Sequence, residues 1–341
     1  MIRVFLSHEP EALKIFYGER AIRELEVFAE VRINDRGRAL TSEMLLAGSR
    51  GCDVVVLDRN TPAEAAFFGA CRDIASVHRC AVDIRTIDVA AASEAGVLVT
   101  HASPGFIDAV AELSLGLMID LARSISFYVS DYRRMAAPPA RRGAQLSGST
   151  LGIIGYGGIG ARLAEVAQAL GMTVLAHDPH KTITDRHVRQ TGLAELLGQS
   201  DFVHCLAAAT PETENLMDET AFAAMKEGAY FINVSRGNLV DEAALERVLA
   251  SGRIAGAALD VGRADDQKPS PGLARLPNVI ATPHIGGQTP AAIESQALET
   301  VEQIRAVSKG VLPRNAINPD RAFRFAEFIE RRSRQSEGAG S

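Results

Sequence analysis

Short apolar runs alternate with longer amphipathic runs along the first 105 residues, which is the pattern of parallel strands separated by helices. Residues 11–31 carry apolar positions at helical spacing and are predicted to form one helix. The apolar runs predicted as strands are residues 2–6, 53–58, 76–82 and 96–102. The pattern therefore predicts a small α/β domain built on a parallel sheet.

The same alternation resumes after a break at Pro104 and Gly105. Residues 107–129 are apolar around most of their circumference, so they predict a long buried helix. The later runs predicted as strands are residues 151–154, 172–178, 201–208, 229–235, 254–261 and 278–283. Six strands with helices between them fill one doubly wound parallel sheet, and we expect this larger domain to span residues 105–289.

The last part of the chain contains one more strong amphipathic helix, at 290–310. This helix is predicted to return the chain to the first domain, which then consists of residues 1–104 and 290–330. Residues 331–341 are polar and are predicted to be disordered. The segment 135–150, rich in proline and small residues, is predicted to be an exposed loop.

A glycine-rich turn carries the first chemical signal. Gly155, Gly157 and Gly160 follow the apolar run Leu151–Ile154 in G-x-G-x-x-G spacing and precede a helical run. In this order the glycines allow a tight turn, a close approach to a pyrophosphate and close helix–strand packing. The residues predicted to contact the cofactor at this turn are Gly155, Tyr156, Gly157, Gly158, Ile159 and Gly160.

An acid ends the next predicted strand. Asp178 stands 23 residues after Gly155, where a carboxylate can accept hydrogen bonds from an adenosine ribose. A 2′-phosphate would be repelled by this carboxylate. The turn and the acid together predict a dinucleotide site that prefers NAD to NADP.

Charge and cysteine content narrow the class of protein. The net charge of −6 and the lack of a basic stripe argue against nucleic acid as a partner. The four cysteines are scattered, without metal-ligand spacing, so we expect no metal site and a reducing, cytoplasmic compartment. The beginning of the sequence lacks the pattern of a signal peptide, and no apolar run is long enough to predict a membrane span.

Polar residues follow three successive predicted strands of the larger domain. Arg236, Asp260 and His284 all stand at carboxyl ends, where open α/β sheets bind their ligands. An arginine can clamp a carboxylate and polarise the adjacent carbonyl group, while a histidine can donate a proton to the oxygen. A neighbouring carboxylate would keep such a histidine protonated and oriented. The set suits reduction of a 2-oxo acid.

From about Val54 to Asn318 the chain resembles the NAD-dependent D-2-hydroxyacid dehydrogenase family. The matching pieces are GYGGIG with Asp178, SDFVHCLAAATPETENLM, FINVSRGNLVDEAAL, GAALDV and NVIATPHIGG. The resemblance implies a Rossmann-type cofactor domain and a smaller, flavodoxin-like substrate domain that both chain ends build. It also implies a small 2-oxo or 2-hydroxy acid of D configuration as the substrate, and a homodimer formed through the cofactor domain.

The resemblance also assigns individual roles. Arg236 would bind and polarise the substrate, and Asp260 would hold the nicotinamide carboxamide. His284 would be the acid/base and would contact both the cofactor and the substrate. The positions that match the family's cofactor-lining residues are Thr210, Pro211 and Val234, and those that match its substrate-carboxylate loop are Ala81, Val82 and Asp83. The acid expected to pair with the histidine falls on Asp265, where the family usually has glutamate.

Several positions depart from the family pattern. Asp266 or Gln267 can replace Asp265 as the partner of the histidine if the loop is shifted by one or two residues. In the substrate loop, Ala81 and Asp83 stand in place of glycines, and Arg85 stands in place of a common aspartate.

Asp58 lies where related phosphoglycerate enzymes tend to carry arginine. Two acids, Asp58 and Asp83, near a substrate carboxylate would repel it unless a cation or a hydroxyl-rich group lies between them. We therefore expect a substrate whose distal part is polar and not phosphorylated. The alternatives are a dehydrogenase for another small anion, such as formate, and a NAD-sensing binding protein without turnover.

Overall fold

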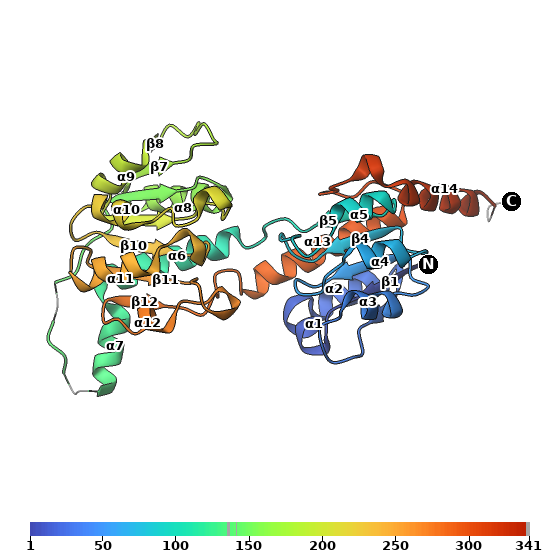
Figure 1. Cartoon of the computed structure of the whole chain (residues 1–341), viewed down its shortest axis with the longest axis horizontal. Coiled ribbons are helices and arrows are strands. Elements are labelled where there is room, and N and C mark those ends of the chain that lie inside the picture. Colours follow the sequence, from blue (N-terminus) through green and yellow to red (C-terminus); the bar gives the residue numbers. More distant parts are fainter. Residues whose placement is uncertain (135–136, 141, 339–341) are drawn as a thin grey trace. The chain divides into compact units, whose positions relative to one another are not determined.

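The computed structural model describes residues 1–134, 137–140 and 142–338, with side chains up to Arg331. The chain divides into two compact units (Figure 1). Unit 1 contains Met1–Gly105 and the chain from Pro290 onward, and unit 2 contains Phe106–Thr289. These borders lie within one residue of the domain borders expected from the sequence.

Unit 1 is built on a parallel five-stranded sheet in the order β2-β1-β3-β4-β5, the flavodoxin-like order. Its strands are β1 (Ile2–Leu6), β2 (Ala29–Ile33), β3 (Val54–Leu57), β4 (Ser76–Arg79) and β5 (Leu98–His101). Its helices are α1 (Pro10–Phe16), α2 (Gly18–Glu26), α3 (Ser42–Gly48), α4 (Ala65–Ala70), α5 (Val89–Glu94), α13 (Pro290–Ser308), α14 (Phe323–Gly338) and the short η4 (Pro319–Arg321). One of its two core clusters includes α13 side chains such as Val301 and Ile304, so the chain end completes the unit.

The single helix expected at 11–31 is wrong. The chain instead forms α1 and α2, broken at Gly18, whose φ of 84° is the left-handed conformation that glycine favours. The last residues of the run form β2, which pairs in parallel with β1 through Val4 and Val31. Pairing with a buried neighbouring strand outweighs the helical spacing of this run.

Unit 2 is built on a parallel seven-stranded sheet in the order β12-β11-β10-β9-β6-β7-β8. Its strands are β6 (Thr150–Ile154), β7 (Thr173–His177), β8 (Val188–Gln190), β9 (Phe202–Cys205), β10 (Tyr230–Asn233), β11 (Gly256–Leu259) and β12 (Val279–Ala281). Its helices are α6 (Ile107–Arg123), α7 (Ile125–Arg134), α8 (Gly158–Ala169), α9 (Leu193–Gln199), α10 (Glu219–Ala224), α11 (Glu242–Ala250), α12 (Pro271–Ala274), η1 (Pro211–Thr213), η2 (Gly237–Leu239) and η3 (Asp265–Gln267). The predicted doubly wound sheet is confirmed. It contains a seventh strand, β8, which was not predicted because three residues are too few to give a clear pattern.

The long helix expected at 107–129 is divided in two. Ser124 adopts a left-handed conformation with φ of 55°, and the Asp120 carboxylate accepts the Ser126 main-chain N–H at 2.8 Å. This side-chain bond competes with the helical one, so the axis turns at Ser124. The first part, α6, buries seven residues, whereas α7 buries none.

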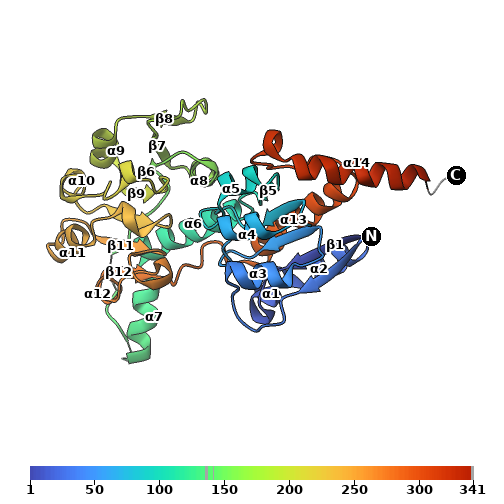
Figure 2. The ribbon, with the colours of Figure 1, turned by 45° about the vertical axis from the view of Figure 1, so that its right-hand side comes forward.

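The chain after residue 331 is helical to Gly338, whereas the sequence predicted disorder there. Phe325 and Phe328, near the start of α14, are buried in the core of unit 1. Once these turns are fixed, helix propagation costs little for residues such as arginine, glutamine and glutamate. Figure 2 shows α14, in red, leading to the C-terminal end.

Some expected features lie outside the described residues. They are residues 339–341 of the tail and Met135, Ala136 and Arg141 of the loop expected at 135–150. Residues 137–140 and 142–145 of that loop contain neither helix nor strand.

Candidate functional site

The glycine-rich turn of unit 2 connects β6 to α8. Gly155 has φ of 91°, and a Cβ placed there would approach the Ala207 main-chain nitrogen to 2.5 Å. A Cβ at Gly160 would approach the Gly155 carbonyl oxygen to 2.6 Å. A Cβ at Gly157, in contrast, would meet nothing within 4 Å. Gly157 therefore leaves the space at the N-terminus of α8 open. Two glycines therefore close the turn, while the third leaves room for a pyrophosphate at the helix N-terminus.

Asp178, just after β7, lies against this turn. Its Oδ2 accepts the Tyr156 main-chain N–H at 2.9 Å, and its Oδ1 accepts the His180 main-chain N–H at 3.0 Å. Each carboxylate oxygen has further lone-pair capacity, so ribose hydroxyls can still donate to it. Lys181 Nζ donates to the Tyr156 carbonyl oxygen at 3.0 Å, which places a cation beside the same turn.

The other expected cofactor positions lie around the ends of strands close to this turn. Gly158 and Ile159 open α8, and Val234, after β10, is buried. Thr210 and Pro211 are exposed at the start of η1, where the Thr210 main-chain N–H donates to Thr213 Oγ1 at 2.8 Å. The glycine turn and Asp178 together fit NAD, since they combine an open helix N-terminus with a carboxylate acceptor.

Asp260, directly after β11, is buried and anchors the loop that carries His284. Its Oδ1 accepts Thr282 Oγ1 at 2.6 Å and the Ile285 main-chain N–H at 2.8 Å. Its Oδ2 accepts the Gly286 main-chain N–H at 2.8 Å. Hydrogen bonds to a charged group contribute roughly 1.5–3 kcal/mol each, so this carboxylate fixes the loop firmly. The sequence did not predict this partnership with Thr282.

His284 has a left-handed backbone conformation, with φ of 59°. Its Nδ1 lies 3.1 Å from the main-chain carbonyl oxygen of Asp266. A carbonyl only accepts hydrogen bonds, so Nδ1 carries the proton in this contact. Nε2 is then the ring atom that is left to exchange a proton with a ligand.

The acids expected to partner His284 lie on η3. The Asp265 side chain is exposed, and the Asp266 carboxylate pairs with Lys268 Nζ at 3.2 Å. Asp266 and Gln267 both have φ of 57°, and the Gly262 main-chain N–H donates to the Gln267 carbonyl oxygen at 2.9 Å. This compact loop turns a main-chain carbonyl, rather than a carboxylate, toward the imidazole.

Arg236 follows β10 and is half-buried. Its Nη1 donates to the Ser235 carbonyl oxygen at 2.8 Å, and its own carbonyl oxygen accepts Asn233 Nδ2 at 2.9 Å. Because β10, β11 and β12 are neighbours in the sheet, Arg236, Asp260 and His284 stand on three adjacent strand ends.

The remaining expected substrate residues belong to unit 1. Ala81, Val82 and Asp83 follow β4, with Ala81 and Val82 half-buried and Asp83 exposed. The carboxylate of Asp83 pairs with Arg85 Nη2 at 2.6 Å and Nε at 3.0 Å. The negative charge that the sequence placed in this loop is therefore balanced by Arg85.

Asp58, after β3, lies in a buried polar cluster. Its Oδ1 accepts Ser7 Oγ and the Thr61 main-chain N–H, both at 3.0 Å. Arg79, at the end of β4 and completely buried, donates to the main-chain carbonyl oxygens of Asp58 and Thr61. Burial lowers the pKa of the Arg79 guanidinium to about 10, although Asp58 opposes this shift.

His8, after β1, completes the cluster. Burial lowers its pKa to about 4, and its Nδ1 has no hydrogen-bond partner among the described residues. Of this group, only Asp58 was recognised from the sequence. The signal that would have found Ser7, His8 and Arg79 is their position at the carboxyl ends of β1 and β4, the two strands on either side of the strand that leads to Asp58.

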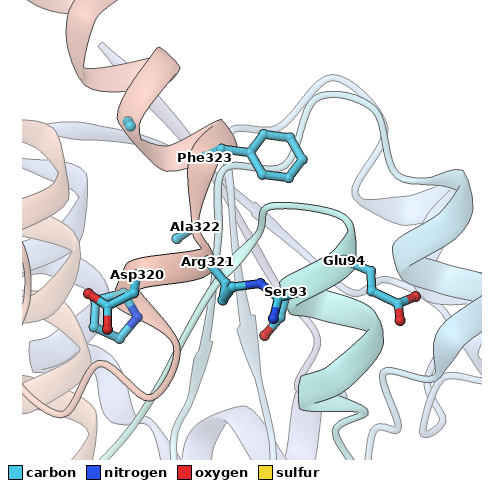
Figure 3. Close-up of a pocket in the computed structure, with 8 residues that line it drawn as sticks. Ser93, Glu94, Asp320, Arg321, Ala322 and Phe323 are labelled. Carbon is cyan, nitrogen blue, oxygen red and sulfur yellow. The ribbon is translucent and has the colours of Figure 1, made fainter.

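A surface pocket of about 360 Å³ lies elsewhere in unit 1 (Figure 3). It is lined by Ser93 and Glu94 at the end of α5 and by residues of η4 and α14. Figure 3 shows Arg321 extending toward Ser93, with Phe323 above it. None of the residues expected at the site lines this pocket.

Two absences concern the described residues only. No group of three or more His, Cys, Asp and Glu side chains within them could hold a metal ion. Nor does this part of the chain contain a helix with the length and apolar character needed to cross a membrane.

The sequence profile of the NAD binding domain of D-isomer specific 2-hydroxyacid dehydrogenases matches residues 115–286. D-3-phosphoglycerate dehydrogenase of Methanocaldococcus jannaschii is 34% identical over 88% of this chain, which spans 57% of that protein. Hydroxypyruvate reductase of Thermotoga maritima is 34% identical, over 82% of this chain and 90% of the reductase.

Solved structures agree with these relatives. The crystal structure of a D-isomer specific 2-hydroxyacid dehydrogenase from Polaromonas superposes with a TM-score of 0.82 at 26% identity. It covers 93% of this chain and 99% of the other. The chain therefore belongs to the D-isomer specific 2-hydroxyacid dehydrogenases, and it carries the NAD-binding domain of that family.

Proposed function

We propose that this chain transfers a hydride between NAD(H) and a small 2-hydroxy or 2-oxo acid of D configuration. The observation that carries the proposal is the set Arg236, Asp260 and His284 on adjacent strand ends of the sheet whose β6–α8 turn fits a pyrophosphate. A protein that only senses NAD needs the turn but not this set. The proposal concerns the chain as it stands, which spans little more than half of its archaeal relative.

In the direction of reduction, bound NADH supplies the hydride. The Arg236 guanidinium pairs with the substrate carboxylate and stabilises the charge that develops on the carbonyl oxygen. His284 donates a proton from Nε2 to that oxygen. We also propose that Ala81, Val82 and Asp83 of unit 1 are substrate-binding residues, as the resemblance to the family implies.

The group that we propose to orient the imidazole is the Asp266 carbonyl, 3.1 Å from Nδ1, and not the Asp265 carboxylate expected from the sequence. Asp260 acts one step further away, because it holds the loop on which the imidazole is carried. Both contacts fix the direction of Nε2 before the substrate binds.

We propose a substrate without a phosphate group. Among the relatives, the phosphoglycerate dehydrogenases act on a phosphorylated acid and the hydroxypyruvate reductase on an unphosphorylated one. In this chain Asp58 stands where related phosphoglycerate enzymes tend to carry arginine, and its carboxylate is buried among hydrogen-bond donors. The neighbouring cation, Arg79, is itself engaged by carbonyl oxygens and completely buried.

A panel of 2-oxo acids tests this proposal. NADH oxidation would be followed with glyoxylate, pyruvate, hydroxypyruvate and 3-phosphohydroxypyruvate at equal concentrations. We expect kcat/KM for hydroxypyruvate to exceed that for its phosphate by about tenfold or more, since this chain carries the acid Asp58 where related phosphoglycerate enzymes tend to carry arginine. The highest kcat/KM on the phosphorylated acid would contradict the assignment.

Two further proposals concern the oligomeric state of the protein and its location in the cell. We propose that two copies of the chain associate through unit 2, because α7 exposes Ile125, Val129 and Tyr132 at helical spacing. We also propose a cytoplasmic location, since all four cysteines are buried and unpaired.

A further inference from the structure

Arg263 lies three residues after Asp260, in the loop that follows β11. Its Nε donates to the Val240 carbonyl oxygen at 3.1 Å, and its Nη2 lies 3.0 Å from the Asn238 carbonyl oxygen. The same Nη2 lies 2.9 Å from Glu214 Oε1 and 2.5 Å from Asn215 Oδ1. One partly exposed guanidinium therefore contacts two other chain segments at once.

The first of these segments is η2, which comes immediately after Arg236. Here the two loops also touch through their backbones, because a Cβ at Gly237 would come within 2.1 Å of the Gly262 carbonyl group. Close to this contact, Arg263 binds the carbonyl groups of Asn238 and Val240. The turn that carries Arg236 is thus held against the loop that begins at Asp260.

The second segment is 214–217, which follows η1 after β9. Its main chain pairs with η2: the Asn215 N–H donates to the Asn238 carbonyl oxygen and the Met217 N–H to the Leu239 carbonyl oxygen, both at 2.9 Å. Asn238 Nδ2 also donates to Glu214 Oε2 at 2.9 Å. Hydrogen bonds from Asn238 and Arg263 lower the pKa of the Glu214 carboxyl group, in keeping with this contact.

The loop of Arg263 is fixed at its own base as well. The Arg263 main-chain N–H donates to Glu242 Oε1 at 3.0 Å, at the start of α11. Glu242 therefore sets the direction of the backbone from which the guanidinium extends. Loops after β9, β10 and β11 meet at this side chain, and β10 and β11 are the strands that lead to Arg236 and Asp260.

We propose that Arg263 is a positioning residue for the reaction: it holds the turn that carries Arg236 in a fixed position against the loop that begins at Asp260. This inference rests on the proposed function, in which Arg236 clamps the substrate carboxylate. The planar fork of a guanidinium reaches carbonyl oxygens and a carboxylate in several directions, whereas the single ammonium of lysine cannot replace it. Arg263 is expected to affect binding of the 2-oxo acid and not binding of NADH.

Arg263→Ala and Arg263→Lys test the proposal in the full chain. We expect kcat/KM for the best 2-oxo acid to fall about tenfold to hundredfold in Arg263→Ala, because small displacements of a clamp are costly. Lysine should restore only a minor part of this loss. NADH affinity, measured by fluorescence titration, should change by less than about threefold, since neither Asp178 nor the glycine turn touches Arg263.

Arg247→Ala is the matched control. Arg247 is an exposed arginine of α11 that pairs with Glu219 at 3.2 Å and touches none of the three loops. Its removal should leave kcat/KM, NADH affinity and the melting temperature close to those of the native chain. An equal loss of kcat/KM in both variants, or a kcat/KM in Arg263→Ala within twofold of native, would overturn the proposal.

Hydrogen exchange separates this proposal from the proposed function. The Asn215, Met217 and Val240 amides, which donate within or between the two segments, should exchange faster in Arg263→Ala and remain unchanged in Arg247→Ala. If the native chain turned over no 2-oxo acid, the proposed function would fail. The exchange rates of these amides would still show whether Arg263 holds the turn. Unchanged exchange at all three positions would refute the positioning role.

Discussion

At the scale of single residues, the functional side chains of unit 2 are held mainly by the main chain. Asp260 binds two amides of the His284 loop, Asp178 binds the Tyr156 and His180 amides, and His284 faces the Asp266 carbonyl. Such contacts fix side chains without requiring further charged residues. They also leave Asp178 with a negative charge that faces the region expected for the ribose.

Removing this charge should change the choice of cofactor. Asp178→Asn keeps an acceptor for the Tyr156 amide but loses the charge, so we expect the NADP/NAD ratio of kcat/KM to rise about tenfold or more. Lys181, close to the same turn, would favour the added 2′-phosphate. Steady-state kinetics with both cofactors measures the ratio, with Asp178→Ser as a second variant. If the NADP/NAD ratio of kcat/KM were unchanged in both variants, the Asp178 carboxylate would not determine which cofactor the protein prefers.

The sequence was sufficient to predict the position of these residues but not their partners. Polar residues after apolar strands predicted the strand-end positions of Arg236, Asp260 and His284, since parallel strands end at one edge of a sheet. The partner of His284 could not be predicted in this way. It depends on two consecutive left-handed residues, Asp266 and Gln267, and neither is a glycine. The local sequence gives no signal for that conformation.

At the scale of elements, long and buried segments were predictable and short or edge segments were not. The buried strands β3, β6 and β9 overlap the mainly apolar runs that predicted them. In contrast, β2 overlaps the end of a run with helical spacing, and β8 has only three residues at the edge of its sheet. In both cases pairing with a neighbouring strand decides the structure, and that neighbour is distant in sequence.

The ends of helices were also difficult to predict from the sequence. The break between α6 and α7 depends on the Asp120 side chain binding the Ser126 amide, a contact that apolar periodicity does not reveal. The continuation of α14 past residue 331 depends on Phe325 and Phe328 being packed in the core. Composition alone described the same segment as a polar tail.

At the scale of the whole molecule, the chain leaves and re-enters unit 1, and α13 completes the core of the unit in which the chain began. This arrangement was expected from the family resemblance and from the strong helix at 290–310. The helix α7 has no such role within its unit, because none of its residues is buried. Phe127 packs against the core, but the exposed side chains of Ile125, Val129 and Tyr132 are available for the proposed second copy of the chain.

A charge on this helix should separate the two copies. In Val129→Asp, an acid replaces a side chain that is 46% exposed, so folding of unit 2 should be little affected while an apolar interface would be disrupted. Light scattering should give a mass near 36.4 kDa for this variant and twice that value for the native chain. Leu170→Asp, at an exposed apolar residue outside α7, should remain dimeric. A native chain that is already monomeric would refute the proposed interface.

In the proposed reaction His284 donates the proton during reduction of a 2-oxo acid. NADH oxidation at 340 nm by the native chain and by His284→Ala tests this role. The native chain should turn over at least one acid, and the variant should bind NADH with similar affinity while kcat falls by about a hundredfold to ten-thousandfold. Turnover that persists undiminished in the variant, or NADH binding without turnover of any acid by the native chain, would contradict the account.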